Sequence, residues 1–311
     1  MPSHDRLPFP TPLHVITGVC APERRRYAHT ISRLGAPVVR ELSTDVDVFH
    51  TVGVDLDSAV VITVVDARHL LDDLTDASPL IEEAALGDDR GDVGARARQA
   101  ATLIELAHLV AVVGWTGLDT DRLSLLMALL SHLAPTALIR LSTSPEGDLL
   151  PLQQHRARTA RWSERPGWVR ALNDEHDAYM TDPRITTFRY EQLRPFHPGR
   201  LVPALDRIDA GDHGRLLRSG GFCRLATRPR TLARWEQVGG AMWIDPLPSD
   251  GLDPAGQDLC LTGLDLDIAG LRRAFDAAAL TDDELEAGPD AWRRFADPLP
   301  RWSSGGSAIR G

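Results

Sequence analysis

The chain has 311 residues, a formal net charge of −10, and 43% hydrophobic and 25% charged residues. This length allows a sizeable hydrophobic core and predicts two domains. The acidic balance disfavours non-specific binding to nucleic acid or to membrane surfaces. No apolar run has the length of a membrane span, and no signal-peptide core opens the chain, so we expect a cytoplasmic protein.

Lysine is absent, because all 34 basic residues are arginine, and asparagine occurs once, at Asn173. A Walker lysine, a Schiff-base lysine and an Asn-Lys-x-Asp base-reading motif are therefore excluded. The three cysteines, Cys20, Cys223 and Cys260, are far apart and odd in number, which argues against a disulfide framework. Cys223 and Cys260 lie in strand-like runs and are expected to be buried.

The first half of the chain alternates apolar, β-branched runs with amphipathic segments. Residues 1–12 are polar and proline-rich and are expected to be flexible, and 87–94 are expected to form an exposed acidic loop. Strands are predicted over 13–16, 57–66, 108–114 and 137–141, and helices over 23–34, 68–74, 95–106 and 119–133. The alternation predicts an α/β domain with a doubly wound parallel sheet over residues 13–142.

The second half differs in composition and in the order of its predicted elements. Residues 143–184 are rich in proline, glycine, arginine and tryptophan and are interpreted as a linker. Beyond them, strands are predicted over 185–191, 221–228, 241–246 and 258–264, and helices over 198–208 and 268–280, the second capped by Asp267. This pattern predicts a smaller α+β domain over 185–302, followed by a flexible tail over 303–311.

The stretch ITGVCAPERRR, residues 16–26, stands where a strand–loop–helix nucleotide fold places its phosphate loop, G-x-x-x-x-G-K-[ST]. Gly18 matches the first glycine, but Glu23, Arg24 and Arg25 replace the second glycine, the lysine and the hydroxyl. The second glycine lets backbone N–H groups approach the phosphates, and Glu23 would add a negative charge beside them. We therefore expect no nucleotide binding at this loop.

Candidate metal ligands are few. Cys20 lies in the former phosphate loop, and His176 and His197 supply imidazoles on predicted loops. No pair has a helical ligand spacing, so architectural hydrogen bonds are the competing explanation for both histidines. Cofactors are accordingly not expected from the residues themselves.

Tryptophan is concentrated in the second half of an otherwise aromatic-poor chain. Trp168, Trp235 and Trp243 are candidate anchors for a protein partner, because tryptophan is enriched at binding hot spots. Packing in a core is the alternative role for each of them.

Four segments together resemble the CobW-like P-loop GTPases. They read AVVITVVDARHLLDDLTDASPL (59–80), RPGWVRALNDEHDAYMTDPRITTFRYEQLRPFHPGRL (165–201), GFCRLATRPRTLARWEQVGG (221–240) and LTDDELEAGPDAWRRFADPLPRW (280–302). The resemblance implies a P-loop-NTPase-like domain followed by a CobW C-terminal domain. It also implies GTP with magnesium, zinc, and a role in metal homeostasis.

The chain departs from the family at its functional motifs. The phosphate loop keeps only Gly18, the base-reading slot reads Gly114-Trp115-Thr116-Gly117, and most of the switch region with its C-x-C-C motif is missing. The leading hypothesis is a degenerate, non-catalytic member that binds proteins. An actinobacterial branch of the family with eroded motifs recruits a hibernation factor to ribosomes when zinc is scarce, and the resemblance implies such a role most closely.

Two alternatives stay open. One is a GTP-binding zinc chaperone with weak GTPase activity, in which Arg24 replaces the lysine. The other is a small-anion binder at the helix start formed by residues 24–26.

Overall fold

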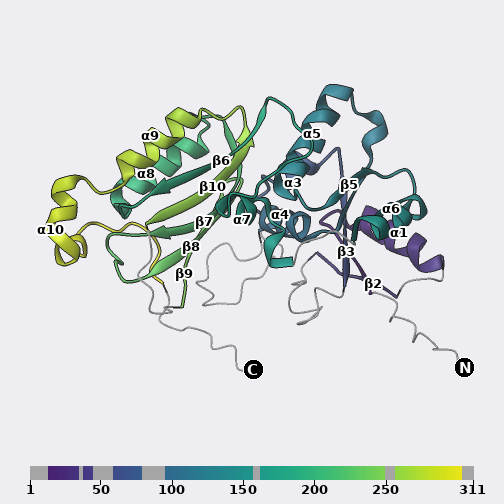
Figure 1. Ribbon diagram of the computed structural model, residues 1–311, viewed down its shortest axis with the longest axis horizontal. Helices are drawn as coiled ribbons and strands as arrows, with labels where there is room; N and C mark the ends of the chain where they lie inside the picture. Colours follow the sequence, from purple (N-terminus) through teal and green to yellow (C-terminus); the bar gives the residue numbers. More distant parts are fainter. Residues whose placement is uncertain are drawn as a thin grey trace, which may run out of the picture.

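In the computed structural model, the structure describes residues 13–34, 38–44, 59–78, 95–156, 162–248 and 256–302. These residues form two five-stranded sheets with helices packed on them (Figure 1). The expected flexible ends, 1–12 and 303–311, and the expected acidic loop over 87–94 lie outside the described residues.

The first sheet is parallel and has the order β2-β1-β3-β4-β5. Its central strand β3 is buried along its whole length, as a β-branched run covered on both faces requires. The strands are β1 (His14–Thr17), β2 (Val39–Glu41), β3 (Val60–Asp66), β4 (Leu109–Val113) and β5 (Leu138–Leu141).

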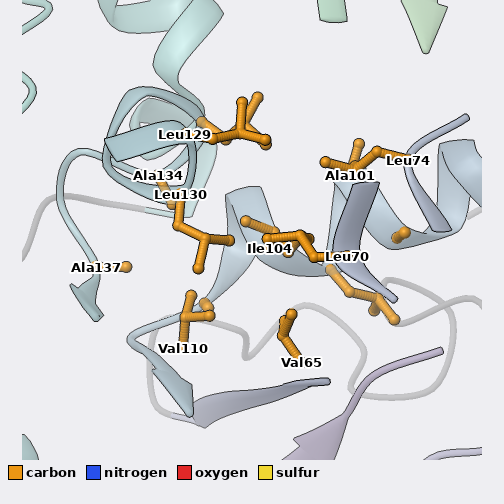
Figure 2. Packing of buried hydrophobic residues seen from close by; sticks show 14 of the residues in the cluster. Val65, Leu70, Leu74, Ala101, Ile104, Val110, Leu129, Leu130, Ala134 and Ala137 are labelled. Atoms are coloured by element: carbon orange, nitrogen blue, oxygen red, sulfur yellow. The ribbon is translucent and has the colours of Figure 1, made fainter. Parts of the chain in front are cut away.

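Helices cover both faces of this sheet. Helices α1 and α6 share one apolar cluster with the strands, and α3, α4 and α5 share another. Figure 2 shows the second cluster, where Leu70, Ile104 and Leu130 lie above Val65 and Val110. The helices are α1 (Ala21–Arg33), α3 (Leu70–Asp73), α4 (Arg96–Leu106), α5 (Thr120–Leu133) and α6 (Pro145–Arg156), with a 3₁₀ turn, η2, over Trp115–Gly117.

Helix α6 is absent from the prediction for this half. It lies in the stretch predicted as a linker, and it begins at Pro145 and contains Pro151. The two prolines and Gly147 obscure the helical pattern in the sequence. Leu152 of this helix is nevertheless fully buried against the sheet. Strand β2 was not predicted as a strand either, whereas the other four strands of this sheet agree with expectation. Asp119 caps α5 by accepting a hydrogen bond from the Arg122 amide.

The second sheet is antiparallel and has the order β6-β10-β7-β8-β9. Its strand β7 begins six residues before the predicted 221, because the prediction stopped at the glycine pair Gly220-Gly221. The strands are β6 (Ile185–Gln192), β7 (Arg215–Arg224), β8 (Leu232–Val238), β9 (Ala241–Pro246) and β10 (Gln257–Leu264).

Helices α8 and α9 cover one face of this sheet, and α7 lies on the side of the first sheet (Figure 1). Asp267 caps α9 by accepting from the Gly270 amide, as predicted. The core holds Tyr190, Phe196, Trp235 and Phe275 in mutual ring contact. The helices are α7 (Gly167–Leu172), α8 (Pro198–Asp209), α9 (Ile268–Ala278) and α10 (Asp282–Trp292), with a kink at Gly288 in α10 and a 3₁₀ turn, η3, over Trp162–Glu164.

A doubly wound parallel sheet followed by an α+β unit confirms the predicted fold class. No helix among the described residues is long and apolar enough to cross a membrane.

Buried charges join the two sheets. The Arg218 guanidinium of β7 donates to both carboxylate oxygens of Glu105 on α4, at 2.7 and 3.1 Å. Glu236 of β8 lies 3.5 Å from Arg218 and accepts from Arg98 of α4 at 2.7 Å. Because the Arg218 and Glu105 side chains are only 3% and 5% exposed, α4 and the second sheet can separate only by exposing unpaired buried charge.

Candidate functional site

The loop at the carboxyl end of β1 is the place where a doubly wound sheet binds its ligand. Only three residues, Gly18, Val19 and Cys20, separate β1 from α1. Helix α1 starts at Ala21, two residues before the predicted start at 23, and has Pro22 in its first turn. Glu23, the residue in the second-glycine slot, is therefore part of the helix.

The backbone conformation and close packing at Gly18 require a glycine, whether or not a ligand binds. Its φ is +136°, and a Cβ atom at this position would lie 2.3 Å from the Val64 carbonyl oxygen of β3. The glycine thus permits the close approach of the loop to the neighbouring strand.

Arg24, in the lysine slot, points into the protein and is 1% exposed. Its Nη1 donates to the Gly18 carbonyl at 2.6 Å and to Thr44 Oγ1 at 2.8 Å, and its Nε donates to Glu41 Oε1 at 2.9 Å. The charge of Arg24 is thus paired inside the protein, and the loop presents a carbonyl, rather than an N–H group, to this side chain.

The other two arginines of the run lie on the surface. Arg25 is 71% exposed, and Arg26 pairs on the surface with Glu23 at 2.8 Å. Arg25 Nε lies 3.9 Å from Glu41 Oε1, the oxygen that Arg24 also contacts. These two cations thus meet at a carboxylate of the chain itself, whereas Arg26 pairs with Glu23.

Asp66 ends β3 beside the loop and is the nearest buried carboxylate that sequence reasoning missed. It accepts hydrogen bonds from the Arg68 amide at 3.0 Å and from Nε and Nη2 of Arg68 at 3.0 and 2.6 Å. Burial raises the pKa of Asp66, but the Arg68 hydrogen bonds and charge outweigh it and hold the pKa below the ordinary value. The spacing Asp-Ala-Arg directly after a buried strand was the available signal.

A cleft of about 400 Å³ opens next to the loop. Its walls are Cys20, His69, Asp72, Asp73, Asp76 and Arg96. Arg96, the first residue of α4, donates to Asp73 Oδ1 at 2.9 Å and to the Val19 carbonyl at 3.2 Å, which ties α4 to the loop. Burial raises the pKa of the Cys20 thiol, and the nearby carboxylates raise it further, although a backbone hydrogen bond at Glu23 lowers it in part. This thiol is therefore protonated at neutral pH.

The candidate metal ligands do not form a site. His176 Nε2 lies 3.1 Å from the His132 carbonyl, and His197 stacks on Phe295 with ring centroids 4.5 Å apart. In the described ranges no three histidine, cysteine or acidic side chains are grouped so that they could hold a metal ion. Cys20, His176 and His197 are thus not brought together.

The slot that corresponds to the family's base-reading motif, residues 114–117, is mostly exposed, and only Trp115 is partly buried. Gly114 has φ +67°, and Trp115 donates from Nε1 to the Ser142 carbonyl at 3.0 Å. Asp119, the nearest acid along the chain, is engaged as the α5 cap. Residues 114–117, Gly-Trp-Thr-Gly, contain no asparagine, lysine or acidic side chain of the kind that the motif would supply.

The candidate anchor tryptophans are packed against the protein itself. Trp235 and Trp243 are 1% and 4% exposed, and Arg98 lies 4.5 Å over the Trp243 ring. Trp168 is partly buried on α7, directly above Gly220 of β7. Trp235 and Trp243 are therefore packed in the core, which was the alternative to a role as partner anchors.

Comparison with known proteins finds a family match within the second half of the chain. Residues 185–279 match the family described as the cobalamin synthesis protein cobW C-terminal domain. These residues run from the start of β6 through the end of α9, so the match spans the antiparallel sheet and both of its covering helices.

Two curated relatives extend the similarity. The zinc-regulated GTPase metalloprotein activator 1 of Dictyostelium discoideum is 26% identical over 224 residues, which cover 63% of this chain and 46% of that protein. A zinc chaperone of Mycobacterium tuberculosis is 27% identical over 153 residues, 39% of this chain and 36% of that protein. The chain thus spans less than half the length of these relatives.

Among solved structures, the Zn(II)-bound YjiA GTPase from E. coli aligns over 81% of this chain and 74% of its own, with 14% identity and a TM-score of 0.31. The family match and the curated relatives carry the assignment. The chain is similar to the CobW-like proteins, and its residues 185–279 match their C-terminal domain.

Proposed function

We propose that this protein acts in zinc or metal homeostasis by binding another protein, and that its loop at Gly18–Cys20 holds no nucleoside triphosphate. The observation that carries the proposal is the inward-turned Arg24. In a phosphate loop the corresponding lysine reaches the β- and γ-phosphates, whereas Arg24 donates to Gly18, Glu41 and Thr44 of its own chain.

The residues present do not fit GTP and magnesium. A triphosphate needs a loop of backbone N–H groups, and here three residues join strand to helix. Magnesium needs a hydroxyl or a free carboxylate, but Arg25 occupies the hydroxyl slot and Asp66 is engaged by Arg68. We therefore derive no hydrolytic step for this chain.

The names of the relatives support the link to zinc and suggest the class of partner. One is a zinc-regulated metalloprotein activator and the other a zinc chaperone, so a metalloprotein client is one candidate. The other is a ribosome-associated hibernation factor, which the loss of the nucleotide motifs favours.

Two measurements test these parts separately. The melting temperature of the purified protein is expected to stay unchanged when GTP and Mg²⁺ are added. A rise of several degrees would refute the proposal that the loop binds no nucleotide. Sedimentation of the tagged protein through sucrose, from zinc-starved and zinc-replete cells, tests the partner. Co-migration with ribosomes only under starvation supports the hibernation-factor role, and the absence of such co-migration refutes it.

The second candidate function, a working GTP-dependent zinc chaperone, is favoured by the relatives' names. It requires metal-dependent phosphate release that Arg24→Ala abolishes and Arg25→Ala, the exposed neighbour, preserves. Phosphate release that is equal in both variants points to a contaminating enzyme and removes this candidate.

A further inference from the structure

Residues 297–302, which follow α10, form a strap over the second sheet. They lie beyond the residues that match the CobW C-terminal family. Arg228 holds the strap from the β7–β8 turn. Its Nε donates to Asp297 Oδ2 at 3.0 Å, and its Nη2 donates to the carbonyls of Leu299 and Pro300 at 3.2 and 2.9 Å.

The strap ends on the edge of the sheet. The Trp302 ring lies under the Arg228 guanidinium, 4.3 Å from its centroid, and donates from Nε1 to the Ile244 carbonyl of β9 at 2.7 Å. Leu299 and Trp302 also pack against the core beneath α8 and α9. A main-chain acceptor of an edge strand is thus satisfied by a side chain.

Strand β9 is the last strand of this sheet, and within the described residues no further strand pairs with it. The Leu247 amide donates to Leu232, so odd-numbered residues here direct their backbone groups toward β8. Met242 and Ile244 consequently direct theirs outward. Such an outward row is a template for strand addition unless it is covered.

The two edges of the sheet are protected differently. At the other edge, β6 carries charged Arg189 and Glu191, and Arg272 donates to the Arg189 carbonyl at 2.9 Å. The middle of β9 is Met-Trp-Ile, without charge. The strap covers it at the Ile244 carbonyl, and Trp243 packs against Ala95 and under Arg98. Charged residues on an edge oppose strand pairing, whereas an apolar edge needs a cover.

We propose that the strap is a removable cap, and that β9 pairs antiparallel with β9 of a second copy of this chain when the cap is released. A two-fold pairing centred on Trp243 places Met242 opposite Ile244 and Ala241 opposite Asp245. No like charges then face each other, and the paired surface is self-complementary, as a two-fold dimer requires.

The test compares two truncations by light scattering over a range of protein concentrations. A stop after Ala296 removes the strap and is expected to give dimers, whereas a stop after Trp302 keeps the strap and serves as the control. The point variant Arg228→Ala is expected to shift the chain toward dimer, and Arg230→Ala, an exposed arginine of the same turn, is not.

A reversal variant identifies the surface. Met242→Pro removes an outward amide and leaves the pairing with β8, so in the strapless chain it should restore the monomer. Circular dichroism and the melting temperature confirm that each variant is folded. A strapless chain that associates no more than the control, or a dimer that persists with Met242→Pro, would overturn the proposal.

Discussion

Arginine–carboxylate pairs occupy two regions of this molecule, the carboxyl end of the first sheet and the joint between the sheets. At the carboxyl end each pair has one partly exposed member, such as Glu41 beside Arg24 or Arg68 beside Asp66. At the joint, Arg218 and Glu105 are both buried. The pairs at the carboxyl end lie beside the loop over Gly18–Cys20, whereas those at the joint hold the two sheets together.

The largest effect is expected at the joint. Arg218→Met leaves Glu105 buried without its partner and should lower the free energy of unfolding by about 3–5 kcal/mol. Urea denaturation measures the loss. The double variant Arg218→Met/Glu105→Leu should recover most of it, because no buried charge is left alone. A loss below about 1 kcal/mol would show that water reaches the joint.

At the carboxyl end, Arg24→Met is expected to lower the free energy of unfolding by about 2 kcal/mol, because three hydrogen bonds from a charged group are lost while Glu41 stays partly hydrated. Arg25→Met, at an exposed position, should change it by less than about 0.5 kcal/mol. Equal effects of the two substitutions in urea denaturation would contradict the inward placement of Arg24.

Gly18→Ala is expected to cost about 1–3 kcal/mol, because φ of +136° is strained for alanine and the new Cβ meets the Val64 carbonyl. Gly117→Ala is a matched control nearby, since a Cβ there meets nothing within 4 Å. Thermal unfolding of both variants checks the difference. If Gly18→Ala is as stable as the control, the loop is looser than described.

A smaller effect is expected from pH. Burial and the nearby His176 lower the pKa of His132 to about 4. The unfolded chain, with a histidine pKa near 6.5, therefore takes up this proton first, and stability is lost as the pH falls from about 6.5 to 4. The loss should reach about 1–3 kcal/mol at most.

Urea denaturation at several pH values checks this contribution. His132→Gln should flatten the pH dependence in that window, whereas the exposed His29→Gln should leave it as in the parent chain. Identical pH profiles of all three proteins would rule His132 out as the source.

The sequence predicted the fold where hydrophobic pattern decides it. Strand β3 is recognisable as a continuous β-branched run, which is typical of a strand buried on both faces, and α9 is recognisable by its single apolar helical stripe. Helix α6 was missed because its prolines hide the period, and β7 was shortened because glycines are unusual inside strands. In both cases packing against the rest of the protein outweighs local propensity.

The candidate site was predictable only in part. The loss of the second glycine and of the lysine can be read directly, but the early start of α1 and the partners of Arg24 depend on residues far along the chain. One signal was available. Arg24, Tyr27, Ala28 and Ile31 follow the i, i+3, i+4, i+7 spacing of a buried helix face, which indicates that Arg24 points inward.

The most direct test of the central claim is a titration of the purified full chain with a fluorescent GTP analogue in the presence of Mg²⁺. The account predicts no saturable signal up to millimolar nucleotide, because Arg24 donates its hydrogen bonds to Gly18, Glu41 and Thr44 of its own chain. Saturable binding that unlabelled GTP displaces, and that Arg24→Ala abolishes, would contradict it.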